Sequence, residues 1–177
     1  ELYTSVQRRI EQISIIFEIS HAINAVLNLD ELLKKIIFIL KKRFGYESIH
    51  ILTVHPGRRK IFYQYGENDA EQLIGSESLV FDMDDPDDIF AWVARNKISA
   101  MTNNLEKDTR FQSAKLPPID NLSELIIPLQ HNNEILGLID IQSKSKNAFD
   151  ENDLFLFEAL AATISSALRN AILYQSE

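Results

Sequence analysis

Cysteine and histidine, two residue types that often carry nucleophilic, acid–base or metal chemistry, are scarce in this sequence. Cysteine is absent, which excludes a disulfide framework, a thiolate nucleophile and a cysteine-containing zinc or iron–sulfur site. The four histidines are His21, His50, His55 and His131. No two of them have a spacing such as i, i+4 that would place them together as metal ligands or as a catalytic pair. We therefore expect each histidine to be structural or solvated, and we expect no metal site.

Two other groups of residues could carry chemistry, and both have simpler explanations. Segment 82–88 contains five aspartates, but it lacks the glycine and the spaced glutamate of a calcium-binding loop. Asp85-Pro86 has the pattern of a helix start, where acidic side chains are stabilising. Ser165-Ser166 lies in a helical pattern with no neighbouring base and no Gly-x-Ser-x-Gly context. The sequence therefore assigns no cation to the aspartates and no nucleophile to the serines.

Composition and charge narrow the class of protein further. The chain has 177 residues, of which 45% are hydrophobic, and 18 basic against 26 acidic residues give a net charge of −8. This balance disfavours a general surface for nucleic acid or an anionic membrane, since both bind through neutralised phosphates. No apolar run approaches the ~20 residues of a membrane helix. We expect a cytoplasmic location and no membrane contact by this region. Because it begins at Glu1 and ends inside a helical pattern, we expect it to be a piece of a longer protein.

Hydrophobic periodicity and turn residues predict helices at both ends of the chain and strands between them. A helix over 5–27 is followed by a second helix, which a capping box at Asn28 and Glu31 begins and Gly45 ends. A middle helix is predicted from Asp85-Pro86 to about Asn96, and Asp150 is predicted to cap the last helix. The predicted strands cover 48–55, 61–65, 79–81, 98–102, 122–129 and 135–143. This order predicts an α+β fold, with an antiparallel sheet of five to six strands bracketed by helices.

Several of these segments together resemble a GAF domain, the small-molecule sensing module of signalling proteins. The stretches Leu125–Leu129 and Ile135–Ile141 are similar to its paired central strands, and Phe149–Asp153 with Leu160-Ala161 and 167–171 is similar to its closing helix. The resemblance implies that the N- and C-terminal helices pack on one face of the sheet and that a pocket lies on the other. It also implies a signalling or dimerisation helix over 1–27 and the GAF domain over 28–177, with 159–177 continuing toward an output domain.

At several positions the sequence departs from the residues with which GAF domains bind known ligands and cofactors. The cyclic-nucleotide signature is incomplete, because Ser143 and Leu154 replace its Asn and Glu around a retained Lys144, Phe149 and Asp153. Without cysteine the chain resembles neither members that attach a bilin nor the cysteine-dependent methionine sulfoxide reductases, and no histidine pattern supports haem. We therefore expect no cofactor and no enzyme activity in this region. The resemblance implies that the full-length protein carries a histidine kinase, a cyclic-dinucleotide enzyme or a transcription activator.

The resemblance also points to residues that would line the pocket. These are Phe81, Trp92, Met101, Asn103, Asn104, Asp108, Arg110 and Phe111. The Arg110 guanidinium suits a small organic anion or another polar metabolite. An ordinary core role for Trp92 and a solvated role for Arg110 are the weightier alternatives. A ligand-free dimerisation spacer, its pocket filled by its own bulky side chains, is the alternative function.

The terminal helices are predicted to join two copies of the chain and to transmit the signal. The residues concerned are Val6, Ile10, Ile13, Phe17, Ile164 and Leu168. Their alternating spacing of 4 and 3 suits packing between helices, and the stripes are wider than one partner in the fold needs. The expected partners are therefore a second copy of the chain and an unidentified small effector.

Overall fold

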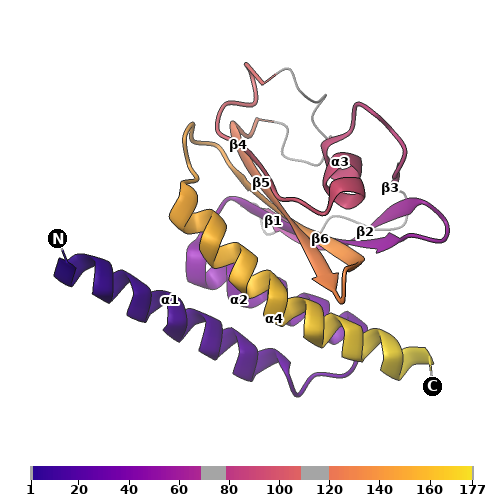
Figure 1. The fold of residues 1–177 in the computed structure, drawn as a ribbon, viewed down its shortest axis with the longest axis horizontal. Coiled ribbons are helices and arrows are strands. Elements are labelled where there is room, and N and C mark those ends of the chain that lie inside the picture. The colour runs from indigo at the N-terminus through magenta and orange to yellow at the C-terminus, as the bar shows by residue number, and fades with distance from the viewer. Residues whose placement is uncertain (1, 69–78, 109–119, 177) are drawn as a thin grey trace.

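A six-stranded antiparallel sheet separates two unequal helical layers (Figure 1). The computed structural model describes residues 2–68, 79–108 and 120–176. The strands are β1 Ser48–His55, β2 Lys60–Asn68, β3 Val80–Asp82, β4 Ala100–Thr102, β5 Ser123–His131 and β6 Glu134–Ser143. The helices are α1 Leu2–Ile23, α2 Leu29–Phe44, α3 Ile89–Asn96 and α4 Glu151–Ser176. The strand order β3-β2-β1-β6-β5-β4 places β1 and β6 at the centre of the sheet. The predicted α+β fold is confirmed.

Local chemistry sets the ends of most elements, as the sequence predicted. The Asn28 side chain accepts a hydrogen bond from the Glu31 N–H at 3.0 Å, and Gly45 ends α2 in the left-handed conformation. Asn132 and Asn133 both have positive φ, as a two-residue hairpin turn between β5 and β6 requires. At the start of α4, the Asp153 N–H donates to the Asp150 carboxylate and the Asp150 N–H donates to the Asp153 carboxylate, each at 2.9 Å. These caps satisfy N–H groups that the first turns leave free.

Three helices lie on one side of the sheet, and α1 is the outermost. Helices α2 and α4 pack on the strands, whereas α1 packs on α4 and α2 (Figure 1). Ile19 and Ile23 of α1 are buried, but the predicted stripe Val6, Ile10, Ile13 and Phe17 is exposed, with fractional exposures of 47 to 72%. Residues 24–27, predicted to be helical, lie beyond the end of α1.

The dimer prediction needs a correction at α4. Ile164 and Leu168 are buried in the core beneath the sheet, with exposures of 1% and 0%. They are therefore not on a surface that a second copy could contact. The predicted spacing was correct as a helix-packing pattern, but the partners of these residues are the chain's own strands and helices.

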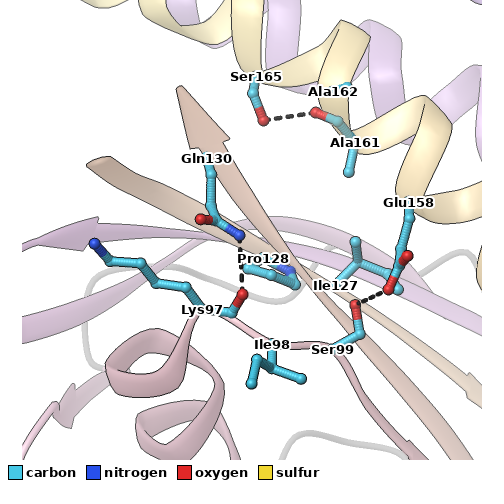
Figure 2. Close-up of a pocket in the computed structure, with 10 residues that line it drawn as sticks. All are labelled: Lys97, Ile98, Ser99, Ile127, Pro128, Gln130, Glu158, Ala161, Ala162 and Ser165. Atoms are coloured by element: carbon cyan, nitrogen blue, oxygen red, sulfur yellow. Dashed lines mark hydrogen bonds between the residues drawn. The ribbon is translucent and has the colours of Figure 1, made fainter. Parts of the chain in front are cut away.

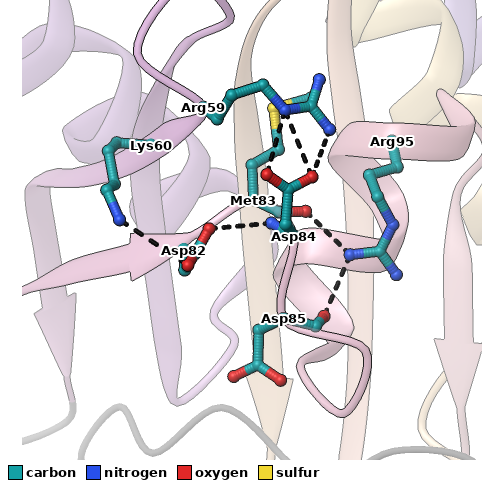
Figure 3. Close-up of polar contacts among 7 residues, drawn as sticks. All are labelled: Arg59, Lys60, Asp82, Met83, Asp84, Asp85 and Arg95. Carbon is teal, nitrogen blue, oxygen red and sulfur yellow. Dashed lines mark hydrogen bonds and ion pairs between the residues drawn. The ribbon is translucent and has the colours of Figure 1, made fainter.

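Among the described helices, α3 is the one that covers the other face of the sheet, and it begins later than predicted. Its N-cap is Asp88, whose carboxylate accepts from the Phe90 N–H at 3.0 Å, so the prediction that Asp85 caps a helix starting at Pro86 is wrong. Figure 3 shows the reason: the Arg95 guanidinium donates to the carbonyl oxygens of Met83 and Asp85 and holds this segment in a turn. The predicted end near Asn96 is confirmed.

The other aspartates of segment 82–88 belong to this turn. Asp84 pairs with Arg59, Asp82 pairs with Lys60, and the Asp82 carboxylate accepts from the Asp84 N–H (Figure 3). Within the part of the chain that the structure describes, no group of three or more histidine or acidic side chains is arranged to hold a metal ion.

The last helix, α4, is both long and apolar. A 25-residue stretch, Glu151–Gln175, is long and apolar enough to cross a membrane by length and composition alone, but half of the apolar window is buried inside the protein. Its buried side faces β5 and the core, with Phe157, Leu160 and Ile164 fully or almost fully covered. The apolar character of α4 is therefore that of a core helix.

We expect Gly137→Ala to destabilise the fold. A Cβ at Gly137 of β6 would lie 2.5 Å from the Leu52 carbonyl oxygen of β1, so the two central strands would have to separate. The cost should be about 2–3 kcal/mol, as for other overpacked cores. Gly57→Ala is the matched control, because a Cβ at Gly57 meets no atom within 4 Å. Urea denaturation measures both; equal stability of the two variants would contradict the close approach of β1 and β6.

Candidate functional site

A row of polar side chains crosses the sheet on the face that α3 covers. The strand pairings Ser48↔Gln142, Gln142↔Glu124 and Glu124↔Thr102 place one polar residue on each of four neighbouring strands. Residues two apart along a strand share a face, so His50 and Asp140, which also pair with each other, form part of a second row beside the first. All six residues are at least 95% buried. A sheet face that is apolar elsewhere therefore becomes polar at one end.

The amide of Gln142 lies between two buried carboxyl groups. Its Nε2 donates to Glu124 Oε2 at 3.0 Å and to Asp140 Oδ2. Its Oε1 in turn accepts from the Asn121 amide, which orients the Gln142 side chain. One amide thus bridges Glu124 and Asp140, whose side chains also hydrogen-bond each other.

The remaining polar atoms of the cluster have no protein partner. Among the described residues nothing hydrogen-bonds Ser48 Oγ, His50 Nε2, Glu124 Oε1 or Asp140 Oδ1. A buried polar atom without a partner costs about 1–3 kcal/mol, and more if it is charged. Such groups are rare in native proteins, and several of them within two adjacent rows make this end of the sheet the candidate site.

Burial also changes the protonation of the cluster. Loss of hydration, followed by the charge of Asp140, raises the pKa of Glu124 well above its ordinary value. Loss of hydration also raises the pKa of Asp140 to about 6, although hydrogen bonds from Glu124 and Gln142 act in the opposite direction. No lysine or arginine among the described residues forms an ion pair with either one. The pair therefore retains a proton at pH values where exposed carboxyls are ionised.

His50 is held as a neutral imidazole. Burial, followed by the charge of Lys41, lowers the pKa of His50 to about 4. Its Nδ1 lies 3.0 Å from the Tyr63 hydroxyl of β2, and a Cβ at Gly66 would lie only 2.1 Å from this nitrogen. Glycine at position 66 is therefore needed to leave room for the imidazole, whose Nε2 has no partner among the described residues.

The structure separates the residues that were predicted to line a pocket. Phe81 and Trp92 pack with the apolar cluster beneath α3, where Phe81 contacts Phe90 edge to face. Met101 packs with the core on the opposite face of the sheet. The α3 face therefore holds Phe81 and Trp92 but not Met101.

The polar residues of the predicted pocket also have different roles. Asn103 uses its side-chain amide on the Phe149 backbone, donating to its carbonyl oxygen at 2.9 Å and accepting from its N–H at 3.1 Å. The Asp108 carboxylate accepts from the Thr102 hydroxyl at 2.9 Å and so extends the polar row, and Asn104 has a buried Oδ1 without a partner. Arg110 and Phe111 lie outside the described residues.

The cluster itself was not predicted, although the sequence contains a signal for it. Ser48 and His50, and likewise Asp140 and Gln142, are polar residues two apart in strands that are otherwise largely apolar, and Glu124 precedes four apolar residues. Period-two spacing indicates one shared face. The signal could have identified that face, but not that the face is buried.

A hollow lies on the other side of the sheet, between α4 and the strand edge (Figure 2). It has a volume of about 370 Å³, and small residues of α4, among them Ala161 and Ala162, form one wall. Its polar groups already have partners: Ser99 donates to Glu158 at 2.9 Å, and Gln130 donates to the Lys97 carbonyl oxygen at 3.0 Å (Figure 2). The polar cluster on the α3 side of the sheet is the better candidate site, because four of its buried atoms have no partner among the described residues.

Comparison with known proteins agrees with this architecture. A family model described as GAF domain matches residues 26–169, and no curated protein matches the chain. The structure superposes on the GAF domain of a phosphoenolpyruvate-protein phosphotransferase from Acinetobacter with a TM-score of 0.78 and 15% identity, covering 94% of this chain and 98% of the other.

Two other solved structures also superpose on this chain, and their names state different roles. A free methionine-R-sulfoxide reductase from Neisseria meningitidis, in complex with its substrate, gives a TM-score of 0.77 at 13% identity over 92% of this chain and 91% of that one. Residues 122 to 287 of a methyl-accepting chemotaxis protein superpose with a TM-score of 0.75 and 19% identity. This match covers 90% of this chain and 99% of the other. At these identities the likeness establishes the fold.

We expect Glu124→Gln to stabilise the protein at pH 8 by on the order of 1–3 kcal/mol. The folded state raises the pKa of Glu124, so folding binds a proton between the unfolded and folded pKa values, and the free energy of unfolding falls as pH rises through this range. Glutamine does not titrate, and the advantage of the variant should therefore shrink toward pH 5. The titratable groups that face Glu124 or its partner are Asp140, His50, Tyr63, Asp88 and Asp108.

Denaturant unfolding at pH 5, 6, 7 and 8 measures this difference in the free energy of unfolding. Glu158→Gln, at an exposed position of α4, is the control for the effect of a Glu→Gln change at a solvated site. A Glu124→Gln advantage that is constant with pH would contradict a proton held by the buried pair.

Proposed function

The chain belongs to the GAF-domain family, and on this premise we propose that it is a regulatory module of a larger signal-transduction protein. In this proposal a small effector binds to the polar cluster beneath α3, and the terminal helices transmit the binding. The observation that carries the proposal is the set of four buried polar atoms, on Ser48, His50, Glu124 and Asp140, that have no hydrogen-bond partner among the residues that the structure describes. A bound effector would supply their missing hydrogen bonds.

The same observation favours an effector over the ligand-free spacer. In a spacer the face beneath α3 would gain stability by packing apolar side chains, as it does around Leu52, Phe90 and Leu138. Buried carboxyls at the end of this face instead reduce stability. Sites that bind ligands commonly retain such unfavourable groups, because their function needs them.

We further propose that this region is not itself an enzyme. Its structural neighbours include methionine-R-sulfoxide reductases, so the fold can support catalysis. This chain has no cysteine for a thiol-dependent reaction of that kind. The proposed catalytic output lies in an attached domain, such as a histidine kinase or a cyclic-dinucleotide enzyme, on the cytoplasmic side.

A short path of hydrogen bonds connects the effector side of the sheet to α4. Thr102 ends β4 in the polar row, and the next residue, Asn103, binds the backbone of Phe149 just before α4. Ser123 reinforces this junction, because its hydroxyl donates to the Ser145 carbonyl oxygen and accepts from the Ala148 N–H. A shift of β4 on ligand binding would therefore be passed to the start of α4.

We also propose that the module forms a homodimer through α1. Its stripe of Val6, Ile10, Ile13 and Phe17 is exposed, and Phe155 of α4, exposed by 66%, extends the apolar surface beside it. A groove of about 600 Å³ between α1 and α4 includes Ile13 and Phe155. Exposed apolar patches of this kind usually mark an interaction surface.

The effector proposal is tested by comparing two buried Ser→Ala variants. Ser48→Ala removes a hydroxyl that has no partner in the described part of the chain, so the variant should fold normally but retain less effector. Ser165→Ala is the control, because the hydroxyl of Ser165 bonds its own helix at Ala161 and lies across the sheet from the cluster. Native mass spectrometry of freshly purified protein should detect a compound in the wild type and in Ser165→Ala.

Thermal-shift screening of a metabolite library should likewise give stabilising compounds whose effect is weaker in Ser48→Ala. A wild type with no retained compound and no response to the library would favour the spacer.

The dimer proposal is tested by Ile13→Glu, which places a charge on the exposed stripe of α1. Sedimentation equilibrium should give a dimer for the wild type and a weakened association, by at least about tenfold, for this variant, since a buried charge opposes the contact. Ile98→Glu is the matched control: Ile98 is exposed by 60%, against 66% for Ile13, but it follows α3 and borders the hollow between α4 and β5 rather than the stripe on α1. Equal association of the two variants would contradict an interface on α1.

A further inference from the structure

We propose that the effector carries a protonated nitrogen, an ammonium or guanidinium group, which binds between Glu124 and Asp140. This inference rests on the proposed function and specifies the chemical class of its ligand. Each of the two carboxyls is at least 98% buried and has one oxygen without a partner among the described residues. A group with several N–H donors and a positive charge is what two adjacent carboxylates bind most strongly.

The electrostatics of the site favour a cation and oppose an anion. Asp88 is also nearly buried, and its charge opposes ionisation of Glu124, while Asp108 accepts from Thr102 at the end of the same row. Ion pairing with Lys or Arg is absent from both carboxyls over the residues that the structure describes. A small anion, the ligand that Arg110 suggested, would meet like charges here.

Neutral groups beside the pair indicate a second polar function on the ligand. His50 pairs with Asp140, and Ser48 pairs with Gln142, so these two side chains project from the strand next to β6, whose backbone lies about 5 Å away. The Ser48 hydroxyl can donate to an oxygen, and the His50 Nε2 can donate or accept according to its tautomer. A compact amine with an oxygen a few bonds from its nitrogen, as in an amino acid or an amino alcohol, fits this arrangement.

The first test supplies the cation from the protein itself. Lysine at position 142 can place its ammonium near both carboxyls, whereas methionine has a similar stem and no donor. We expect Gln142→Lys to melt about 5 °C above Gln142→Met at pH 8. The gap should narrow at pH 5, where the carboxyls are protonated and attract the ammonium less. The groups that face the new ammonium and titrate are Glu124, Asp140, His50, Tyr63, Asp88 and Asp108.

A Gln142→Lys variant that melts at or below Gln142→Met at pH 8 would overturn the inference, because the site would then have no preference for a positive charge. This comparison needs no knowledge of the natural ligand. If the lysine variant does not fold while the methionine variant does, the inference is overturned in the same way.

The second test uses matched probes that differ only at the nitrogen. The twenty amino acids are compared with 2-hydroxy acids of the same skeletons, and putrescine and agmatine represent amines without a carboxylate. At least one amine should raise the melting temperature of the wild type, and its hydroxy analogue should bind at least about tenfold more weakly. Glu124→Gln and Asp140→Asn should each lose tenfold or more in affinity for that amine.

The results of these tests separate the preference for a cation between Glu124 and Asp140 from the proposed binding of an effector. A retained compound without a basic nitrogen, or a hydroxy acid that binds as well as its amine, overturns the inference and leaves the effector proposal intact. A stabilised Gln142→Lys, with no retained compound and no responding probe, supports the cation preference and removes the evidence for an effector.

Discussion

The antiparallel pairing of β1 with β6 is the constraint on which both faces of the molecule depend. It aligns Ile49 and Ile51 with Ile141 and Ile139 on the face beneath α2 and α4, and it aligns His50 with Asp140 on the face beneath α3. Side chains alternate along a strand, so a slip of one residue would exchange the two faces and place carboxyls in the apolar core. Gly137, opposite Thr53, lets the two strands approach closely enough to fix this register.

The polar end of the sheet opposes the stability that the rest of the core provides. Two adjacent carboxyls lose their hydration there, and one amide, that of Gln142, is their shared protein donor. This loss of hydration raises the pKa of both groups, and the pair therefore retains a proton. The cost of this arrangement becomes understandable if the folded state is completed by a ligand, since binding energy stabilises a protein that is otherwise suboptimal.

The fold could be predicted in large part from the sequence, because local chemistry sets the ends of its elements. Asn28, Gly45, the Asn132-Asn133 turn and the Asp150 cap act within a few residues of themselves, and each was predicted correctly. The start of α3 was not. Its position depends on Arg95, which reaches back to carbonyl groups ten and twelve residues earlier and holds Pro86 in a turn. A contact of that kind depends on how the chain folds back, and no local pattern reports it.

For the candidate site, the sequence by itself determined which residues share a face and little more. Alternation places Ser48 with His50 and Asp140 with Gln142, but polar residues at such spacing are ordinary on a sheet that faces water. The tertiary structure decided that α3 covers this face, that Met101 lies on the opposite one and that Asn103 binds the start of α4. Burial is the physical reason: the same carboxyl is unremarkable in water and costly beneath a helix, and only the packed chain determines which applies.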